Sequence, residues 1–207
     1  MKFDTVVLAT QNKHKIKEIT HYLKGITKNY LNLSCVDGLP EIIENGDTFF
    51  ENALIKAKAV YEHTKIPSLA EDSGLVVPAL NNEPGVRSAR YAGEHATREA
   101  LISKLLTNMK NLRNEKRNAY FQTTFVFYAS AESTPVNIES EGRVYGRIAL
   151  SPRGSNGFGY DPVFIPDGHT RTFAEMTLQE KNSMSHRGKA LAGLLKKFED
   201  GKISEYP

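Results

Sequence analysis

The first strand-like segment of the chain runs into a cluster of polar and basic residues. The cluster occupies positions 10–15 with the sequence TQNKHK, directly before an amphipathic helical pattern. A helix N-terminus presents backbone N–H groups without intrahelical acceptors, together with a partial positive charge that favours anions. With Lys13, His14 and Lys15 in one turn, this segment is a candidate phosphate-binding site, although it lacks the GxxxxGKS/T pattern of a P-loop. The alternative is an ordinary helix cap with its lysines in solvent.

A group of acidic residues follows, and carboxylates are ligands that Mg²⁺ prefers. Its members are Glu41, Glu44, Asp47, Glu51, Glu71 and Asp72. Mg²⁺ takes oxygen ligands and keeps several waters while it binds phosphorylated substrates. We expect Asp72 at a strand end, before a sharp turn at Gly74, because sites form at strand ends in α/β sheets. The alternative is that these acids cap helices and face solvent, as Glu51 does in the capping-box pattern TFFE at 48–51.

Three glycines surround two aromatic residues in the segment 154–162, which reads GSNGFGYDP. Glycine costs folding entropy, but it lets the backbone approach a ligand closely. We expect Phe158 or Tyr160 to stack on a base, and Asp161 to hydrogen-bond with the edge of that base. The alternative is a long connection between strands with buried aromatic side chains.

The segment 180–187, EKNSMSHR, places several positive donors near the start of a helix. Lys181, His186 and Arg187 are the donors, and Ser185 is the expected helix cap. A solvated basic turn is the alternative. Together the four segments supply cationic donors, a carboxylate metal site and an aromatic slot for phosphoanhydride chemistry on a nucleotide. The sequence contains neither a GxSxG nor an HExxH motif, so neither motif indicates a different class of hydrolase.

Hydrophobic periodicity predicts the elements that must position these segments. We expect strands at 3–9, 31–36, 68–70, 75–80, 119–129, 136–149 and 163–165, and helices at 12–24, 97–109, 177–182 and after Thr48 and Ser185. In the helix after Thr48, we assign the apolar face to Phe50, Ala53, Leu54, Ala57 and Tyr61, and the opposite side to Lys56 and Lys58. The two long strands in the middle are expected to pair antiparallel. Interleaved strands and helices then indicate a mixed α/β sheet with two lobes.

Composition bounds the class of protein. The chain has 207 residues, a formal net charge of +3 and a single cysteine, which indicates one domain spanning 1–207. A lone cysteine excludes an internal disulfide, and the apolar surroundings of Cys35 predict a buried thiol. We find no run of roughly 18 apolar residues and no signal peptide, so we expect a cytoplasmic protein without a membrane partner. The composition shows no clustered basic patch, so we expect no nucleic-acid partner.

Taken in chain order, these motifs resemble those of the ITPase-type noncanonical purine nucleoside triphosphate pyrophosphatases, the dITP/XTP pyrophosphatase family. The matching segments are 9–18, 48–53, 72–75, 84–91, 157–162 and 180–187, so they span nearly the whole chain. Each segment is weak alone, whereas the ordered set is specific. His14 is a departure, because many members have glycine there, and its side chain narrows the backbone freedom of the turn.

The resemblance implies a fold, an activity and an assembly. The family has an elongated mixed α/β fold with flanking helices and an active-site cleft between two lobes. It hydrolyses ITP, dITP and XTP to the nucleoside monophosphate and pyrophosphate with Mg²⁺ as cofactor, which cleans the nucleotide pool, and members are usually homodimers. The alternatives are a pyrophosphatase for other modified nucleotides and a nucleotide- or RNA-binding protein without turnover.

The resemblance also implies roles for individual residues. Glu44 and Asp72 are expected as magnesium ligands, with Asp72 also the general base and Lys15 a catalytic residue on the triphosphate. The other expected substrate contacts are Thr10, Gln11, Asn12, Lys13 and His14 at the phosphates, Ser73 beside the substrate, Phe158, Gly159, Tyr160 and Asp161 at base and sugar, and Lys181, His186 and Arg187 at phosphate or base. Donors aimed at the C6 carbonyl of the base would discriminate against adenine.

Overall fold

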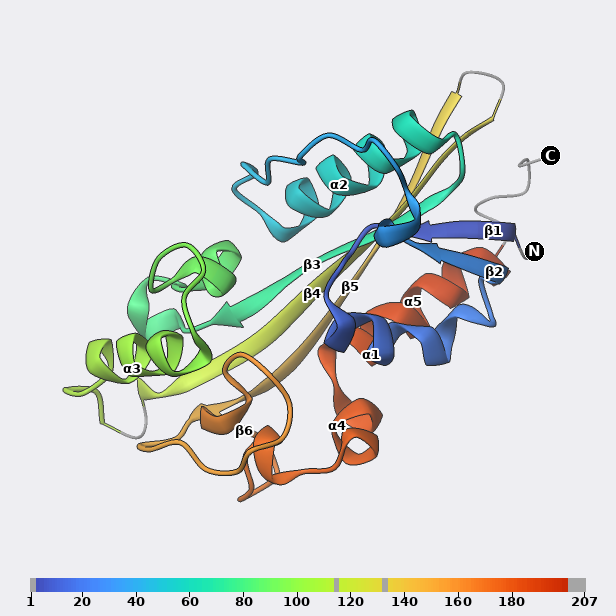
Figure 1. Ribbon diagram of the computed structural model, residues 1–207. Coiled ribbons are helices and arrows are strands. Elements are labelled where there is room, and N and C mark those ends of the chain that lie inside the picture. Colours follow the sequence, from blue (N-terminus) through green and yellow to red (C-terminus); the bar gives the residue numbers. More distant parts are fainter. Residues whose placement is uncertain (1–2, 114–115, 132–133, 201–207) are drawn as a thin grey trace. The chain divides into compact units, whose positions relative to one another are not determined.

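The computed structural model of the protein describes residues 3–113, 116–131 and 134–200 (Figure 1). Its strands are β1 (Phe3–Leu8), β2 (Thr27–Asn32), β3 (Ser68–Val76), β4 (Asn118–Ala131), β5 (Thr134–Ile148) and β6 (Phe164–Pro166). Its helices are α1 (Lys13–Leu23), α2 (Phe49–Thr64), α3 (Arg98–Asn108), α4 (Leu178–Met184) and α5 (His186–Glu199). Across these described ranges, no helix has the length and apolar character needed to cross a membrane.

The described strands form one six-stranded sheet in the order β2-β1-β3-β4-β5-β6. β1 pairs in parallel with β2 and with β3, whereas β5 and β6 pair antiparallel. The sheet is therefore mixed and interleaved with helices, which confirms the predicted fold class. β4 and β5 are neighbours in the sheet, and their predicted antiparallel pairing stays a prediction.

The chain folds into two compact units, in keeping with the two lobes expected. Unit 1 contains 1–72, 123–142 and 187–207, and unit 2 contains 73–122 and 143–186. The helices α1 and α2, with α5 from Arg187 onward, belong to unit 1, and α3 and α4 belong to unit 2. The strands β3, β4 and β5 contribute residues to both units.

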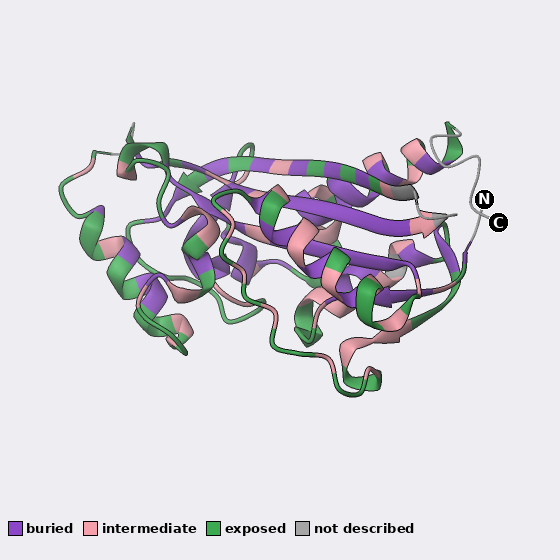
Figure 2. Ribbon diagram, turned by 90° about the horizontal axis from the view of Figure 1, so that it is seen from above, coloured by how far each residue is buried: buried purple, intermediate pink, exposed green. Residues whose placement is uncertain are grey.

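In unit 1, helices cover both faces of the sheet. Phe125 and Phe127 of β4 pack in a cluster with Ile19 of α1 and Leu194 of α5, whereas Val126 between them packs in a cluster with α2. Successive strand residues point to opposite faces, so a strand that is covered on both faces is apolar throughout. Figure 1 shows α2 on one side of these strands and α1 and α5 on the other, and Figure 2 shows buried residues concentrated along the strands.

In unit 2, aromatic side chains form the centre of the core. The ring centroid of Phe164 lies 4.8 Å from that of Phe121 and 5.1 Å from that of Phe173. Leu101 and Leu105 of α3 belong to the same cluster. Burial of these large apolar side chains stabilises the unit and holds its long loops in place.

The second strand lies earlier in the chain than predicted. β2 pairs with β1 from Phe3↔Thr27 to Leu8↔Asn32, and 33–35 form a short 3-10 turn. The predicted strand at 31–36 is therefore wrong in its bounds, because pairing along β1 sets where β2 begins and ends. Cys35 is exposed, so the predicted buried thiol is wrong as well.

The third strand, β3, continues without a turn through Gly74. The predicted turn at Gly74, and the position of Asp72 at a strand end, are therefore wrong. β3 extends beyond the end of β1 as a neighbour of β4 in the sheet, and its place in the sheet outweighs the local preference of a glycine for a turn.

The helix α2 has the predicted cap, and of its predicted apolar face Ala53 and Ala57 are fully buried, whereas the other three residues are partly buried. The Glu51 N–H donates to the Thr48 hydroxyl at 3.1 Å, and the Thr48 N–H donates to the Glu51 carboxylate at 2.9 Å. The buried residues of α2 are Phe49, Asn52, Ala53, Lys56, Ala57 and Val60. Lys56, predicted to lie opposite the core, is therefore on the buried face, whereas Lys58 is exposed as predicted.

Candidate active site

The turn after β1 lies beside β3 because the two strands are parallel neighbours. Leu8 pairs with Leu69, and the Ala9 N–H donates to the Leu69 carbonyl oxygen at 2.9 Å. β1 ends at Leu8, whereas β3 continues beyond this pair. The residues that follow β1 are therefore placed next to the part of β3 that contains Glu71 and Asp72.

Asn12 caps α1 and uses two of the backbone donors at its N-terminus. Its Oδ1 accepts from the backbone N–H groups of His14 at 3.0 Å and Lys15 at 3.3 Å. The Asn12 N–H in turn donates to the Thr10 hydroxyl at 3.2 Å. The exposed residues of this turn are Gln11, Asn12, Lys13 and His14. The helix cap considered as the alternative is thus present, so phosphate binding here rests mainly on the basic side chains.

Glu71 is a buried carboxylate that pairs with cations on both of its oxygens. Lys15 Nζ lies 2.7 Å from Glu71 Oε1, and Arg187 Nε lies 3.4 Å from Oε2. The Thr123 hydroxyl also donates to Oε2, at 2.9 Å. Burial raises the pKa of the Glu71 carboxyl, but the charges of Arg187 and Lys15 outweigh burial and hold that pKa well below its usual range. Glu71 is therefore ionised, and it fixes the position of the Lys15 ammonium.

Arg187 joins this network to a second carboxylate. Its Nη1 lies 2.9 Å from Glu18 Oε2, and both side chains are only 3% exposed. The structure thus gives the guanidinium two buried carboxylate partners, Glu18 and Glu71, within unit 1. Its expected contact with phosphate or base stays a prediction.

Glu44 and Asp72 lie beside one lysine ammonium, and Asn52 holds Asp72. Lys56 Nζ lies 2.6 Å from Glu44 Oε2 and 3.8 Å from Asp72 Oδ1. Asn52 donates from Nδ2 to Asp72 Oδ2 at 3.2 Å and accepts from the Gly46 N–H at 2.8 Å. Asn52 therefore connects Asp72 to the loop that carries Glu44, and Lys56 holds the two carboxylates close together.

Burial dominates the titration of Asp72. It raises the pKa of the Asp72 carboxyl above its usual value, and the nearby charges of Lys56 and Lys15 oppose it without cancelling it. The Lys56 ammonium therefore favours the ionised form of this carboxyl, against the effect of burial.

The donor set of Glu44 and Asp72 fits Mg²⁺. The two carboxylates converge on a single positive charge, the Lys56 ammonium, so the site already favours a cation. Among the described residues, no group of three or more His, Cys, Asp or Glu side chains forms a closed metal cage. Mg²⁺ does not require such a cage, because it is commonly bound by one or two carboxylates together with waters and substrate phosphates.

In unit 2, the glycine-rich loop is held in shape by Asp161. Its Oδ2 accepts from the Phe158 N–H at 2.9 Å and lies 2.8 Å from Lys181 Nζ. The same ammonium lies 4.7 Å from the centroid of the Phe158 ring, within the range of a cation–π interaction. Lys181 and Asp161 are buried, so their pairing fixes the loop around Phe158.

Tyr160 and His186 have buried side chains with structural partners. The Tyr160 hydroxyl donates to the Ser88 carbonyl oxygen at 3.0 Å, and burial raises the pKa of Tyr160 well above its usual range. The His186 ring stacks on Phe121, with centroids 5.1 Å apart and planes 12° apart. Ser73 is partly exposed on β3. The expected substrate contacts of these residues and of Gly159 stay predictions.

Gly157→Ala should destabilise the protein more than Gly159→Ala. Both glycines have positive φ, at 71° and 55°, so both substitutions strain the backbone. A Cβ at Gly157 would also collide with the Asp161 carboxylate, whereas a Cβ at Gly159 would meet nothing within 4 Å. We expect Gly159→Ala to cost about 1–2 kcal/mol and Gly157→Ala clearly more in urea unfolding. Equal losses would contradict the role of Asp161 in shaping the loop.

Several residues of these networks were not assigned roles from the sequence. Glu18 and Asn52 were given no role, Lys56 was assigned to the polar side of its helix, and Glu71 appeared only in the group of candidate acidic residues. The sequence pattern could have indicated Asn52 and Lys56, because both fall at the helical spacing of the buried face of α2. A polar residue at a core position of a helix indicates a buried partner. The pairing of Glu18 with Arg187 has no local signal in the chain.

Known proteins resemble this chain over nearly its whole length. The Ham1 family model matches residues 6–197. A dITP/XTP pyrophosphatase of Lactobacillus acidophilus is 45% identical over 193 residues, which cover 92% of this chain and 95% of that protein. A dITP/XTP pyrophosphatase of Geobacter sulfurreducens is 45% identical over 187 residues, which cover 90% of this chain and 92% of that protein.

Solved structures agree with the sequence comparison. A HAM1 protein from Coxiella burnetii has a TM-score of 0.86 at 41% identity, and the match covers 96% of this chain and 100% of that chain. The Ham1 protein of Staphylococcus aureus has a TM-score of 0.85 at 34% identity, and the match covers 95% of this chain and 99% of that chain. On motif order, fold and similarity over nearly its full length, the chain belongs to the Ham1 family.

Proposed function

We propose that this protein hydrolyses noncanonical purine nucleoside triphosphates, namely dITP, XTP and ITP, to the nucleoside monophosphate and pyrophosphate. The observation that carries the proposal is the convergence of Glu44 and Asp72 on Lys56 in unit 1. Relatives that cover nearly the whole chain are dITP/XTP pyrophosphatases. Removal of such nucleotides keeps the pool of nucleic-acid precursors clean. We propose that residues 1–207 act as one pyrophosphatase domain.

We propose Mg²⁺ as the cofactor, held by Glu44 and Asp72. When bound there, Mg²⁺ would neutralise phosphate charge and polarise the phosphoryl group. Lys56 already places a positive charge between the same two carboxylates. The side chains of the protein would supply the remaining charge stabilisation.

Lys15 and Asp72 have distinct tasks in this reaction. Water attacks the α-phosphorus, and the bond from that phosphorus to the oxygen bridging to the β-phosphorus breaks. Asp72 orients the water and accepts its proton, as a general base. Lys15, which Glu71 holds in place at 2.7 Å, donates to the triphosphate and stabilises the negative charge that grows on the leaving pyrophosphate. Thr10, Gln11, Asn12, Lys13 and His14 are proposed to contact the phosphates.

The base and sugar are proposed to contact the glycine-rich loop and the residues near it. Phe158 is half-buried and offers a ring for stacking, while Gly159 brings the backbone close to a ligand. Asp161 and Lys181 support this loop through their ion pair at 2.8 Å. Further proposed contacts are Ser73, Tyr160, His186 and Arg187. Hydrogen-bond donors that face the C6 carbonyl oxygen of hypoxanthine or xanthine would face the C6 amino group of adenine instead. These donors would then lack an acceptor, which strongly disfavours ATP as a substrate.

A panel of nucleoside triphosphates tests the activity. We expect XTP, dITP and ITP to yield the monophosphate and pyrophosphate in the presence of Mg²⁺, and ATP to react far more slowly. Formation of a nucleoside diphosphate and orthophosphate would contradict the proposal. We also expect a homodimer, which light scattering measures through the mass in solution. We expect it in the cytoplasm, which localisation of the tagged protein tests.

Lys56→Met should lower kcat by about 10²–10³-fold, as expected for loss of a preorganised electrostatic partner. Without the Lys56 ammonium, the pKa of the buried Asp72 carboxyl would rise further, and Glu44 and Asp72 would lose their shared positive partner. Lys58→Met is the matched control, because Lys58 is on the same helix, is 54% exposed and pairs only weakly with Glu62 at 3.6 Å. Similar activities of the two variants would exclude this role for Lys56.

A further inference from the structure

A cavity of about 330 Å³ in unit 2 is lined by three arginines. It lies at the end of β5 and the turn that follows, and its lining includes Arg117, Arg147, Ser151, Arg153, Leu150 and Ile165. No Asp or Glu belongs to the lining. The walls therefore combine concentrated positive charge with a small apolar surface.

Arg117 is a buried cation whose partners among the described residues are backbone carbonyl groups. It is 3% exposed. Its Nε and Nη2 each donate at 2.9 Å, to the carbonyl oxygens of Ile148 and Ala149, and its Nη1 donates to that of Met109 at 3.0 Å. Within the described ranges, no carboxylate pairs with this guanidinium. A buried charge without an opposite charge is unfavourable, and a bound anion would relieve it.

The other two arginines add charge at the mouth of the cavity. Arg147 is exposed on β5, opposite Ile165 of β6, and it forms no ion pair with a carboxylate in the described part of the chain. Arg153 donates from Nη2 to the Thr170 carbonyl oxygen at 2.8 Å, and its Nε lies 3.6 Å from Glu175. The charge of Arg153 is thus partly neutralised by Glu175. Among the described residues, no carboxylate neutralises Arg117 or Arg147.

We propose that this cavity is a binding site for a small phosphate-bearing anion, separate from the proposed catalytic residues. Arginine favours this chemistry because its planar fork matches phosphate oxygens with two parallel hydrogen bonds. The volume exceeds the size of a phosphate ion alone and falls in the range of small-molecule sites. Leu150, which is 72% exposed, and Ile165 give an apolar wall that suits an organic group attached to the phosphate.

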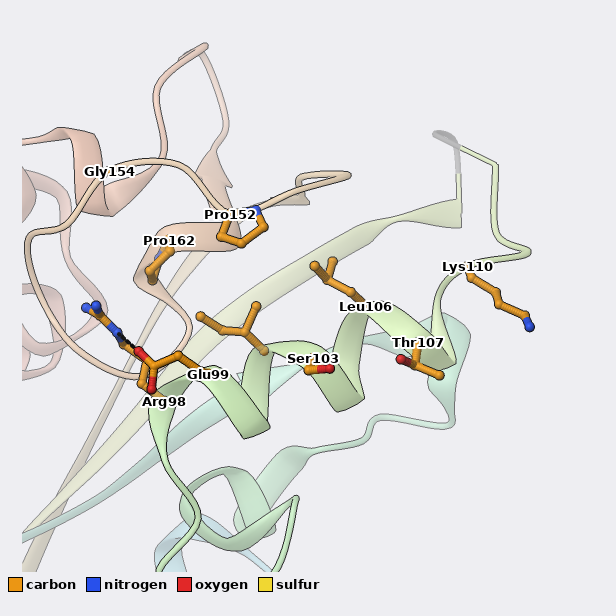
Figure 3. A pocket seen from close by; sticks show the side chains of 10 residues that line it. Arg98, Glu99, Ser103, Leu106, Thr107, Lys110, Pro152, Gly154 and Pro162 are labelled. Carbon is orange, nitrogen blue, oxygen red and sulfur yellow. Dashed lines mark hydrogen bonds and ion pairs between the residues drawn. The ribbon is translucent and has the colours of Figure 1, made fainter.

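A second cavity in unit 2 provides a contrast and a control. It has about 560 Å³ and lies between α3 and the segment that carries Pro152, Gly154 and Pro162 (Figure 3). Its arginine, Arg98, is paired with the neighbouring Glu99 at 3.4 Å, and Glu99 belongs to the lining. The charge of Arg98 is therefore already compensated, so Arg98→Gln is a matched control for Arg147→Gln.

Amide NMR of the full chain, titrated with sodium phosphate at constant pH and ionic strength, tests the proposal site by site. We expect saturable shifts for the amides of 147–153 in the wild type and in Arg98→Gln. In Arg147→Gln and in Arg153→Gln, the dissociation constant read from these amides should rise roughly tenfold, as expected for loss of a charge-assisted hydrogen bond. Arg117 is left unchanged because it holds three backbone carbonyl groups.

A parallel titration with AMP distinguishes a free phosphate from the phosphoryl group of a nucleotide. Equal affinity for both would identify the phosphate as the recognised group. Tighter binding of AMP that Leu150→Ser weakens, without weakening phosphate binding, would identify a phosphorylated organic ligand. Shifts at 147–153 that do not saturate, or that are identical in the wild type and Arg147→Gln, would overturn the proposal whatever the activity of the enzyme.

Discussion

Asp72→Asn should lower kcat for XTP by about 10²–10⁴-fold, the effect expected when a positioned general base is lost. The Asp72 carboxyl is held by Asn52 at 3.2 Å and lies 3.8 Å from Lys56 Nζ, so it has a fixed orientation. Asparagine keeps the size and one hydrogen-bonding oxygen, but it cannot take a proton or offer a carboxylate to a cation. Steady-state kinetics with pyrophosphate as the measured product gives the effect.

Asp47→Asn is the matched control for this substitution. Asp47 lies on the exposed part of the loop that precedes α2, and its backbone N–H, not its side chain, contacts Glu51 at 2.8 Å. We expect wild-type kinetics from this variant, and unchanged circular dichroism from both. Asp72→Asn with activity near that of the wild type would remove Asp72 from the reaction.

Arg187→Met should lower the free energy of unfolding by about 3–5 kcal/mol, because removal of one partner leaves uncompensated charge inside the protein. Glu18 and Arg187 are each 3% exposed, and Glu71 is 1% exposed. Solvent therefore screens little of the negative charge that Arg187→Met leaves without its partner. Urea unfolding, followed by circular dichroism, measures the change through the midpoint of the transition.

Two further variants separate lost charge pairing from a general disturbance of α5. Arg187→Met combined with Glu18→Gln should recover part of the stability, because one of the stranded carboxylates is removed. Lys196→Met, at an exposed position of the same helix, should change the unfolding free energy little. If Arg187→Met unfolded at the wild-type urea concentration, the buried network would not be a source of stability.

Local patterns in the chain predicted most of the elements. Asn12, Thr48, Thr97 and Thr177 cap α1, α2, α3 and α4 in the structure, because a cap involves only neighbouring residues. The apolar run VVL in β1 is likewise typical of a strand that is covered on both faces, and it lies within the strand predicted at 3–9. These features depend on a few consecutive residues, so the sequence contains the information directly.

Features set by distant parts of the chain were missed. The bounds of β2 depend on pairing with β1, and the continuity of β3 through Gly74 depends on its place beside β4 in the sheet. The ion pair of Arg187 with Glu18 joins residues 169 positions apart. No local periodicity encodes such a contact, and burial of both charges appears only when the chain is folded.

The burial of Lys56 could be predicted in part from the local pattern. Ala53 and Ala57 of the predicted face of α2 are buried, but the buried face turns toward Phe49 and Val60 and includes Lys56. This partial rotation of the face separates a solvated lysine from one that pairs with Glu44 and lies near Asp72. Polar residues at the spacing of the buried face are the signal that could have identified this part of the site.

Hydrolysis of XTP in oxygen-18 water tests the central claim most directly. If water attacks the α-phosphorus, with Asp72 as base and pyrophosphate as leaving group, the label enters the nucleoside monophosphate and the pyrophosphate carries none. Mass spectrometry of both products measures this. Label in the pyrophosphate or in released orthophosphate would mean attack at another phosphorus, and it would contradict the proposed reaction.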